Sequence, residues 1–170
     1  MTNFDRRAVV GGLTVASFAT VATSANAAPA MVKPADIKKE ADVACVYHCD
    51  FGETPRFAQV INNISNHYSV YGNPLEVQLA IVAHSAGVRY FLTDWAASPR
   101  KDDVLDPSIF ERVENVAKNG LKVYLCDITF QRLKLDRGKI HDAGFISFVP
   151  SGVATVAALQ SKGFVYMKIG

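Results

Sequence analysis

The feature that most constrains the fold is a regular alternation of strand-like and helix-like segments from residue 43 onwards. Runs rich in β-branched and aromatic residues occur at 43–49, 75–84, 121–126, 143–150 and 164–169. Helical patterns separate most of these runs, as parallel strands require. We therefore expect a three-layer, flavodoxin-like α/β domain with a mostly parallel five-stranded sheet and helices on both faces.

Turn and capping residues mark the helices that connect these strands. Thr54, Asp106 and Ser151 are residue types that commonly begin helices, and each precedes a segment with apolar residues at helical spacing or a helix-forming run. Gly120 is expected to end the helix that begins near Asp106. A further helix is expected over residues 86–98, directly after the second strand.

The first 27 residues are typical of an export signal. Arg6 and Arg7 precede a mildly apolar stretch, and Ala25 and Ala27 form a small-x-small cleavage pattern. Paired arginines before such a stretch resemble a twin-arginine signal, which predicts export to the periplasm. The alternative is an uncleaved membrane anchor, which the many Gly, Thr and Ser residues disfavour.

Beyond the signal at residues 1–27, we expect a flexible lead-in at 28–41 and one domain at 42–170. The whole chain has 18 Lys and Arg against 16 Asp and Glu. Its charge is therefore nearly balanced, which gives no electrostatic reason to expect nucleic acid as a partner. The mature form holds no other segment that is long and apolar enough for a membrane span.

Residues with chemical potential follow three of the expected strands. The first strand ends in His48 and Cys49, the second is followed by His84 and Ser85, and the third ends in Cys126. Parallel sheets bind ligands beyond the carboxyl ends of their strands. A flavodoxin-like order places the first strand between the second and third, about 4.8 Å from each. That order would bring these side chains together and place Cys49 near Cys126.

Each of these residues also has a purely structural interpretation. Cysteine is among the most buried residue types, so a cysteine at a strand end is more often part of the core than reactive. Cys45 and Cys49 lie four residues apart on one strand, about 13 Å, which is too far to share a metal ion. The count of three cysteines is odd, so at least one thiol is free, modified, metal-bound or paired between chains.

Several familiar motifs are absent from the chain. It contains no G-x-G-x-x-G, no Walker A motif, no C-x-x-C and no G-x-S-x-G. Dinucleotide binding, ATP hydrolysis, thioredoxin-type redox chemistry and serine hydrolysis therefore lack their usual signatures. We expect no cofactor from these patterns.

Five stretches of the chain resemble the DsrE/DsrF-like family. The C-terminal block FVPSGVATVAALQSKGFVYMKI resembles the closing signature of that family, and VYHCDFG resembles its first strand. INNISNHY, AIVAHSAGVRYFL and GLKVYLCDITF resemble its first helix, its second strand and its cysteine-bearing strand. The resemblance covers residues 43–169. It implies a flavodoxin-like domain that forms homo-oligomers, in which Cys126 carries sulfur as a persulfide during sulfur relay.

The resemblance implies an exported sulfur-handling protein whose activity, if any, is persulfide transfer. Its partners would be sulfur donor and acceptor proteins or small sulfur species. The chain departs from the family pattern at Ser85, where Gly is common, and at Cys49. A basic run follows Cys126, and it is either a solvated face or an attractant for a sulfur anion: Arg132, Lys134, Arg137 and Lys139.

Two other functions are consistent with the residues. The protein could be a non-catalytic, oligomeric binding or accessory module in which Cys126 is buried and inert. It could instead bind a metal or act in redox chemistry through His48, Cys49, His84 and Cys126, because thiolates and imidazoles suit zinc or copper. A Cys49–Cys126 disulfide is a related possibility.

Overall fold

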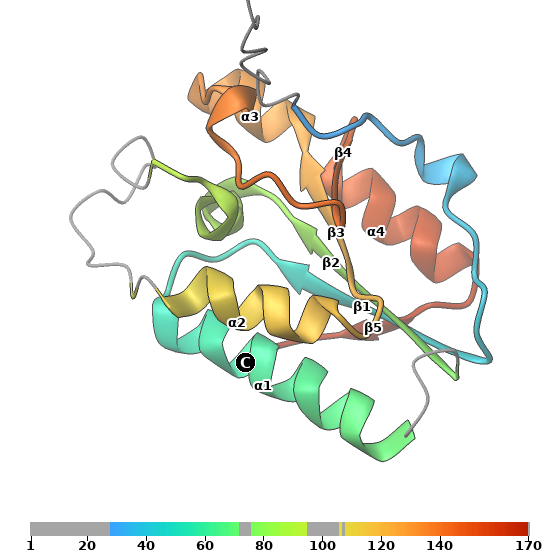
Figure 1. Ribbon diagram of the computed structural model, residues 1–170. Helices are drawn as coiled ribbons and strands as arrows, with labels where there is room; N and C mark the ends of the chain where they lie inside the picture. The colour runs from blue at the N-terminus through green and yellow to red at the C-terminus, as the bar shows by residue number, and fades with distance from the viewer. Residues whose placement is uncertain (1–27, 72–75, 95–105, 107, 170) are drawn as a thin grey trace, which may run out of the picture.

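The computed structural model describes residues 28–71, 76–94, 106 and 108–169 (Figure 1). The predicted signal at 1–27 lies outside these residues. The strands are β1 (Val43–Cys49), β2 (Val77–Ala83), β3 (Lys122–Cys126), β4 (Ile146–Val149) and β5 (Val165–Met167). The α-helices are α1 (Thr54–Tyr71), α2 (Ser108–Ala117), α3 (Asp127–Leu133) and α4 (Gly152–Ser161). Short 3-10 helices are η1 (Pro34–Asp36), η2 (Ser85–Phe91) and η4 (Arg137–Lys139).

All five strands pair in parallel, in the order β4-β3-β2-β1-β5. The expected α/β class and parallel five-stranded sheet are therefore confirmed. The expected position of the first strand is wrong: it was expected between the second and third strands, but β2 lies between β1 and β3. Each of the first three strands is placed next to the one before it, so the ends of β1 and β3 are separated by a full strand.

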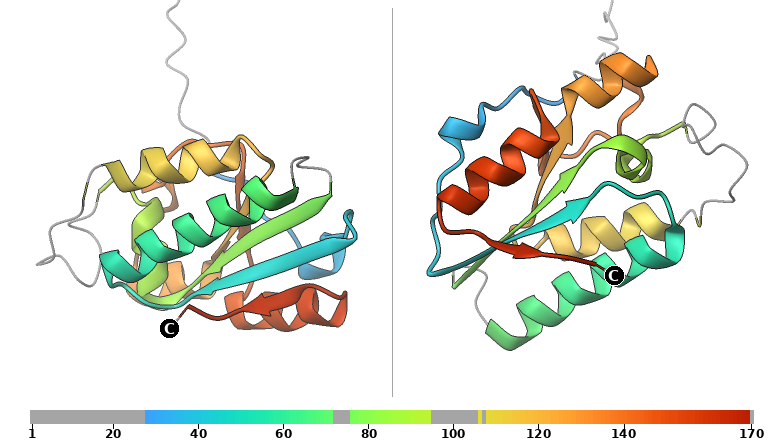
Figure 2. Two further views of the ribbon diagram at one scale, coloured as in Figure 1. Left: turned by 90° about the horizontal axis from the view of Figure 1, so that it is seen from below. Right: turned by 180° about the vertical axis from the view of Figure 1, so that it is seen from behind.

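Helices cover both faces of the sheet. Figure 2 shows α1 and α2 on one side of the strands and α4 on the other. Side chains alternate between these faces along each strand. Tyr47 and Ile81 lie in the core beneath α1 and α2, whereas Val46 and Val82 lie in the core beneath α4. The face on which a strand-end side chain lies therefore depends on whether its position along the strand is odd or even.

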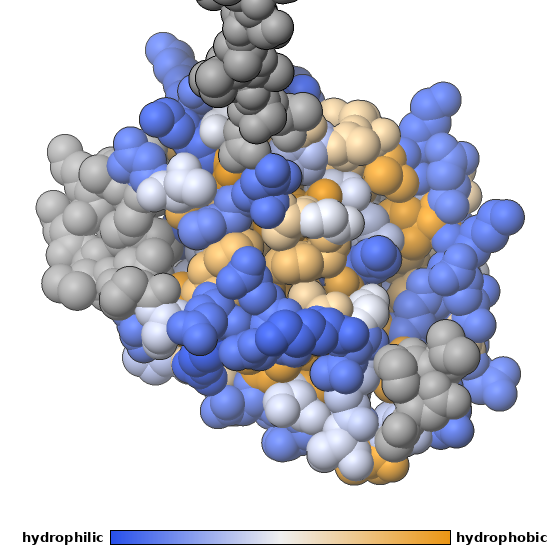
Figure 3. Space-filling view, viewed as in Figure 1, coloured by the Kyte–Doolittle hydropathy of each residue, from blue (hydrophilic) through white to orange (hydrophobic). Residues whose placement is uncertain are grey.

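Helix α2 covers its part of the sheet with an apolar side formed by Ile109, Phe110, Val113 and Val116. Its outer surface is hydrophilic, and apolar side chains are visible above it towards the β3 and β4 half of the sheet (Figure 3). Gly120 has a φ of +95° and follows this helix, as the sequence predicts, because glycine adopts the left-handed region without a steric cost.

The segment after β2 differs from the expected helix at 86–98. Residues Ser85–Phe91 form a 3-10 helix, and residues 95–98 lie outside the described part of the chain. Gly87 packs directly on the end of β1, where a Cβ atom would lie 2.2 Å from the carbonyl oxygen of Cys49. This close backbone approach explains a glycine here and holds the tight turn against the sheet.

The predicted lead-in contacts the domain at several points. Met31 forms a parallel bridge with Phe148 on β4, and Ile37 is buried in the core beneath α4. The ammonium group of Lys162 donates to the carbonyl oxygens of Pro34, Ala35 and Ile37 at 2.6–2.8 Å. These contacts pack the segment against the domain, a feature that its composition does not indicate.

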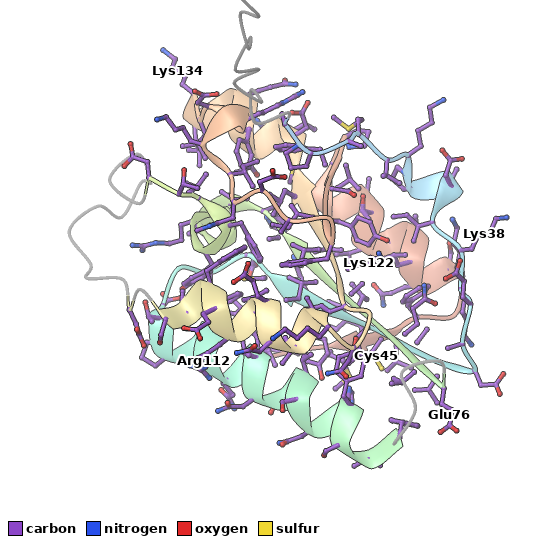
Figure 4. All side chains as sticks on the ribbon, viewed as in Figure 1. Lys38, Cys45, Glu76, Arg112, Lys122 and Lys134 are labelled. Atoms are coloured by element: carbon purple, nitrogen blue, oxygen red, sulfur yellow. The ribbon has the colours of Figure 1, made fainter. Side chains whose placement is uncertain are left out.

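No helix in the described part of the chain combines the length and the apolar character that crossing a bilayer requires. Figure 4 shows that Cys45 lies near Glu76, towards the end of the sheet where β1 and β2 begin, while Lys134 lies on the other side of the molecule, after α3. Cys45 is therefore remote from the carboxyl ends of the strands.

Candidate functional site

A pocket of about 530 Å³ lies at the carboxyl ends of β2 and β3, beside the first turns of α3 and α4. Its position follows from the parallel sheet, whose strand ends open towards loops and helix N-termini on one edge. Ten residues line it: His84, Ser85, Ala86, Cys126, Ile128, Thr129, Arg132, Leu133, Ser151 and Val153. The pocket therefore contains Cys126, His84 and Ser85 from the set that the sequence predicts.

Cys126 is the last residue of β3 and immediately precedes α3. Its side chain is 5% exposed and lies on the α4 side of the sheet. A Cβ atom built on Gly152 would lie 3.1 Å from the Cβ atom of Cys126 and 3.0 Å from that of His84. Gly152 thus lets the start of α4 approach both residues, and it places the thiol beside the positive end of that helix.

His48 and His84 form a direct pair on the α4 side of the sheet. Their Nε2 atoms lie 2.6 Å apart and share one hydrogen. The Nδ1 atom of His48 lies 2.9 Å from the hydroxyl group of Tyr166, and the Nδ1 atom of His84 lies 2.9 Å from Oγ of Ser85. The result is a continuous hydrogen-bonded chain from the exposed Tyr166 on β5 to the pocket.

Burial lowers the pKa of His84, and the neighbouring His48 lowers it further, while Asp50 acts in the opposite direction. The imidazole of His84 is therefore favoured in its neutral form at neutral pH. One ligand atom each of His48, Asp50 and His84 lies within 4.8 Å of the others. These three residues are the group in the described part of the chain that could hold a metal ion.

Ser85 occupies an unfavourable backbone conformation at the edge of the pocket. Its φ is +50°, in the left-handed region that favours glycine. Its amide donates to Oγ1 of Thr129 at 3.0 Å, and its hydroxyl group contacts His84. A serine at this position therefore adds a hydroxyl group to the histidine chain at the expense of backbone strain.

The charges after Cys126 have distinct partners. Arg137 forms an ion pair with the buried Asp127, which also accepts a hydrogen bond from Gln131 at 2.7 Å. Arg132 is exposed and lines the pocket. The negative charge closest in sequence to Cys126 is thus balanced by Arg137, and Arg132 contributes positive charge to the pocket.

Cys49 does not join the site, which corrects the expected grouping of four residues. It lies in the core beneath α1 with no exposed surface, on the opposite face from Cys126. Burial raises its pKa far above the usual range, and Asp50 adds to that shift. The error has two causes. First, β2 separates β1 from β3. Second, His48 and Cys49 are adjacent in the strand, so their side chains lie on opposite faces of the sheet.

Some of the site residues were not predicted. Thr129 and Ser151 line the pocket, and Tyr166 extends the histidine pair. Tyr166 lies within the C-terminal signature and so carries a sequence signal, but its contact depends on the pairing of β5 with β1. Asp50 directly follows β1, at the edge of the sheet where ligands bind to parallel α/β folds.

The fold and the site define an α/β protein with a parallel sheet and a cysteine in a pocket at the end of its third strand. The chain belongs to the DsrE/DsrF-like family, which matches it over residues 18–169. This family is associated with sulfur metabolism. The predicted family is therefore confirmed.

Among solved structures, the chain is similar to the protein of unknown function MTH1491 from Methanobacterium thermoautotrophicum. The two share 21% sequence identity with a TM-score of 0.58, over 74% of this chain and 98% of that one. At this identity the likeness concerns the fold alone. No curated protein matches the chain.

Proposed function

We propose that this protein is a sulfur carrier or relay component that holds sulfur as a persulfide on Cys126. The observation that carries the proposal is the position of Cys126 in a pocket at the carboxyl end of β3, in a chain of the DsrE/DsrF-like family. The alternative, a non-catalytic accessory module, predicts that Cys126, which is 5% exposed, does not react although it lines the pocket.

The chemistry requires a thiolate, because the thiolate is the nucleophile in sulfur exchange. The Cys126 thiolate attacks the terminal sulfur of a persulfide or polysulfide donor. A sulfur–sulfur bond forms at Cys126 as the bond within the donor breaks, and the donor leaves as its shortened thiolate. One sulfur atom is transferred without net oxidation, and the same step in reverse passes it to an acceptor thiolate.

Three features of the pocket favour an anionic sulfur chain. The N-terminus of α4 places partial positive charge beside Cys126, and Arg132 adds a cation at the pocket wall. Apolar side chains of Ile128, Leu133 and Val153 line the remainder and are each more than a third exposed. Such a wall suits a sulfur chain and could also contact an acceptor protein.

Loading with polysulfide followed by release with cyanide tests the proposal. The wild-type protein is expected to yield about one cyanide-labile sulfur per chain, because only one cysteine lines the pocket. The Cys126→Ser variant should yield none. Cys49→Ser is the matched control, since Cys49 is a buried cysteine on the opposite face, and it should load as the wild type does. Equal loading of wild type and Cys126→Ser would refute the proposal.

The proposal includes export to the periplasm by the twin-arginine route, with sulfur donor and acceptor proteins or small sulfur species as partners. Its support is the pair Arg6 and Arg7 ahead of an apolar stretch in the first 27 residues. Replacing both arginines with lysine keeps the charge and should retain the precursor in the cytoplasm. Unchanged periplasmic recovery of that variant would contradict this route.

Assembly as a homo-oligomer is part of the same proposal. Its support is the family resemblance together with the edge strand β5, where Val165 is 57% and Tyr166 is 39% exposed. Sedimentation equilibrium of the purified protein tests it. A mass above that of one chain is expected, and a single monomeric species at micromolar concentration would contradict it.

A further inference from the structure

The geometry points to a divalent metal site, suited to Zn²⁺, formed by His48, Asp50 and His84. The site lies at the carboxyl ends of β1 and β2, next to the pocket that contains Cys126. It uses none of the three cysteines, so it does not require the proposed persulfide, although His84 also lines the pocket that contains Cys126. Two imidazoles and one carboxylate leave a fourth position for water or a small ligand, as in zinc sites with three protein ligands.

The three ligand atoms converge closely enough for side-chain movements to bring them around one ion. All of them lie within 4.8 Å of one another, and the two Nε2 atoms are 2.6 Å apart. Nitrogen ligands at 2.0–2.1 Å in a tetrahedral site lie roughly 3.3 Å apart. The two rings therefore need to separate by roughly 0.7 Å to admit an ion. Asp50 is exposed, so its carboxylate can turn towards the histidine pair.

The second nitrogen of each ring already has the partner that metal-binding histidines require. Such a histidine usually donates its other N–H group to a neighbouring acceptor, which orients the ring. Here the Nδ1 atoms of His48 and His84 face the hydroxyl groups of Tyr166 and Ser85. These contacts fix both Nε2 atoms towards the same point.

The hydroxyl partners also permit the change of tautomer that metal binding demands. Without metal, one of the two Nε2 atoms carries the shared hydrogen, so one ring is an Nε2–H tautomer. With metal, both Nε2 atoms must be bare and both rings must be Nδ1–H tautomers. A hydroxyl group can donate or accept, so Tyr166 and Ser85 can serve either state. Binding therefore moves one hydrogen within one ring and needs no net loss of a proton from the pair.

The ligand set differs from a cysteine-based site in a way that an experiment can separate. Cys49 lies on the opposite face of the sheet, and Cys126 is not among the three residues with converging ligand atoms. A site of imidazole and carboxylate ligands should therefore survive the loss of either thiol.

Calorimetric titration of the untagged, full-length protein with Zn²⁺ tests the inference, and the visible spectrum of bound Co²⁺ reports the ligand geometry. One ion per chain is expected. His48→Gln and His84→Gln should abolish the binding. Tyr166→Phe, which leaves all three ligands in place, should weaken the affinity about 10- to 100-fold.

Two controls isolate the site. His67→Gln removes a histidine that contacts Tyr47 on the other face, and it should bind as the wild type does. Cys126→Ser should also keep the ion. Circular dichroism checks that each variant is folded. If a histidine variant unfolds, the Zn²⁺ affinity of Tyr166→Phe tests the site instead, because Tyr166 is partly exposed and its replacement should not unfold the protein.

Three results would overturn the inference. The first is a wild-type protein that takes up no Zn²⁺. The second is a folded His48→Gln or Tyr166→Phe variant that binds Zn²⁺ as tightly as the wild type. The third is loss of binding in Cys126→Ser, which would assign the ion to a thiolate site. Polysulfide loading on Cys126 is measured separately, so failure here leaves the proposed sulfur chemistry standing.

Discussion

Cys49 and Cys126 end strands β1 and β3, but their side chains lie on opposite faces of the sheet with β2 between them. Strands β1 and β3 are two strand spacings apart, about 9–10 Å, whereas a disulfide needs Cα atoms within about 7 Å. The three cysteines are free thiols in the structure. The chemistry at the strand ends therefore concerns one thiol and not a pair.

The first prediction concerns thiol reactivity. Cys126 lines the pocket, whereas Cys49 has no exposed surface and burial raises its pKa, so Cys126 should be alkylated first in the folded protein. Peptide mapping after brief treatment with iodoacetamide measures the order. Cys49 should react only after unfolding. Modification of Cys49 before Cys126 would contradict this placement of the two thiols. An intramolecular Cys49–Cys126 disulfide after mild oxidation would contradict it as well.

The second prediction concerns Gly152 in the V-P-S-G-V signature. An added Cβ atom would press on the Cβ atoms of His84 and Cys126 at 3.0–3.1 Å, and neither can rotate away. Gly152→Ala should destabilise the protein by about 1–3 kcal/mol and slow sulfur loading. Chemical denaturation measures the first effect. Gly144→Ala is the control, because its new Cβ atom meets nothing within 4 Å, and a cost equal to that of Gly152→Ala would refute the packing argument.

The third prediction concerns the strained backbone at Ser85. Ser85→Gly and Ser85→Ala both remove the hydroxyl contact with His84, but only glycine relieves the positive φ. The glycine variant should therefore be more stable than the alanine variant by about 1 kcal/mol in denaturant unfolding.

Lys134 provides a matched control for this strain. Its φ is +54° at the end of α3, outside the histidine chain. Lys134→Gly should raise stability by about 1 kcal/mol with no effect on sulfur loading. Equal stability of the two Ser85 variants would mean that the left-handed conformation there carries no cost.

The fourth prediction concerns acid stability. Burial lowers the pKa of His141, whose ring stacks on Phe110 with centroids 3.6 Å apart. Below the ordinary value of 6.5, the unfolded chain binds a proton that the folded chain resists, so stability should fall as pH drops. His141→Phe keeps the stacking and removes the proton site. Its free energy of unfolding should therefore fall less steeply below pH 6.5. An unchanged slope would exclude His141 as a source of the loss of stability in acid.

The general fold was accessible from the sequence because strands and helices carry local signals. Ser151 accepts from the amide of Ala154 at the start of α4, and Gly120 ends the segment after α2, as expected. No bounds were predicted for helix α3, because it is short and begins directly after Cys126. The helix has too few turns for its apolar residues to show a helical period.

The site was only partly accessible, because its grouping depends on strand order. His84 and Cys126 were placed correctly at strand ends, but the position of β1 beside β2 and β5 is a property of the whole chain. That pairing separates Cys49 from the site and brings Tyr166 to His48. No local pattern encodes which of two adjacent residues faces α4 until the register is known.

The most direct test of the proposed function is mass spectrometry of the protein purified from its native host without reductant. The proposed persulfide predicts one additional sulfur atom on the peptide that contains Cys126, which reductant removes, and unmodified thiols at Cys45 and Cys49. Wild-type protein whose Cys126 remains an unmodified thiol, even after exposure to polysulfide, would contradict a sulfur-carrying role.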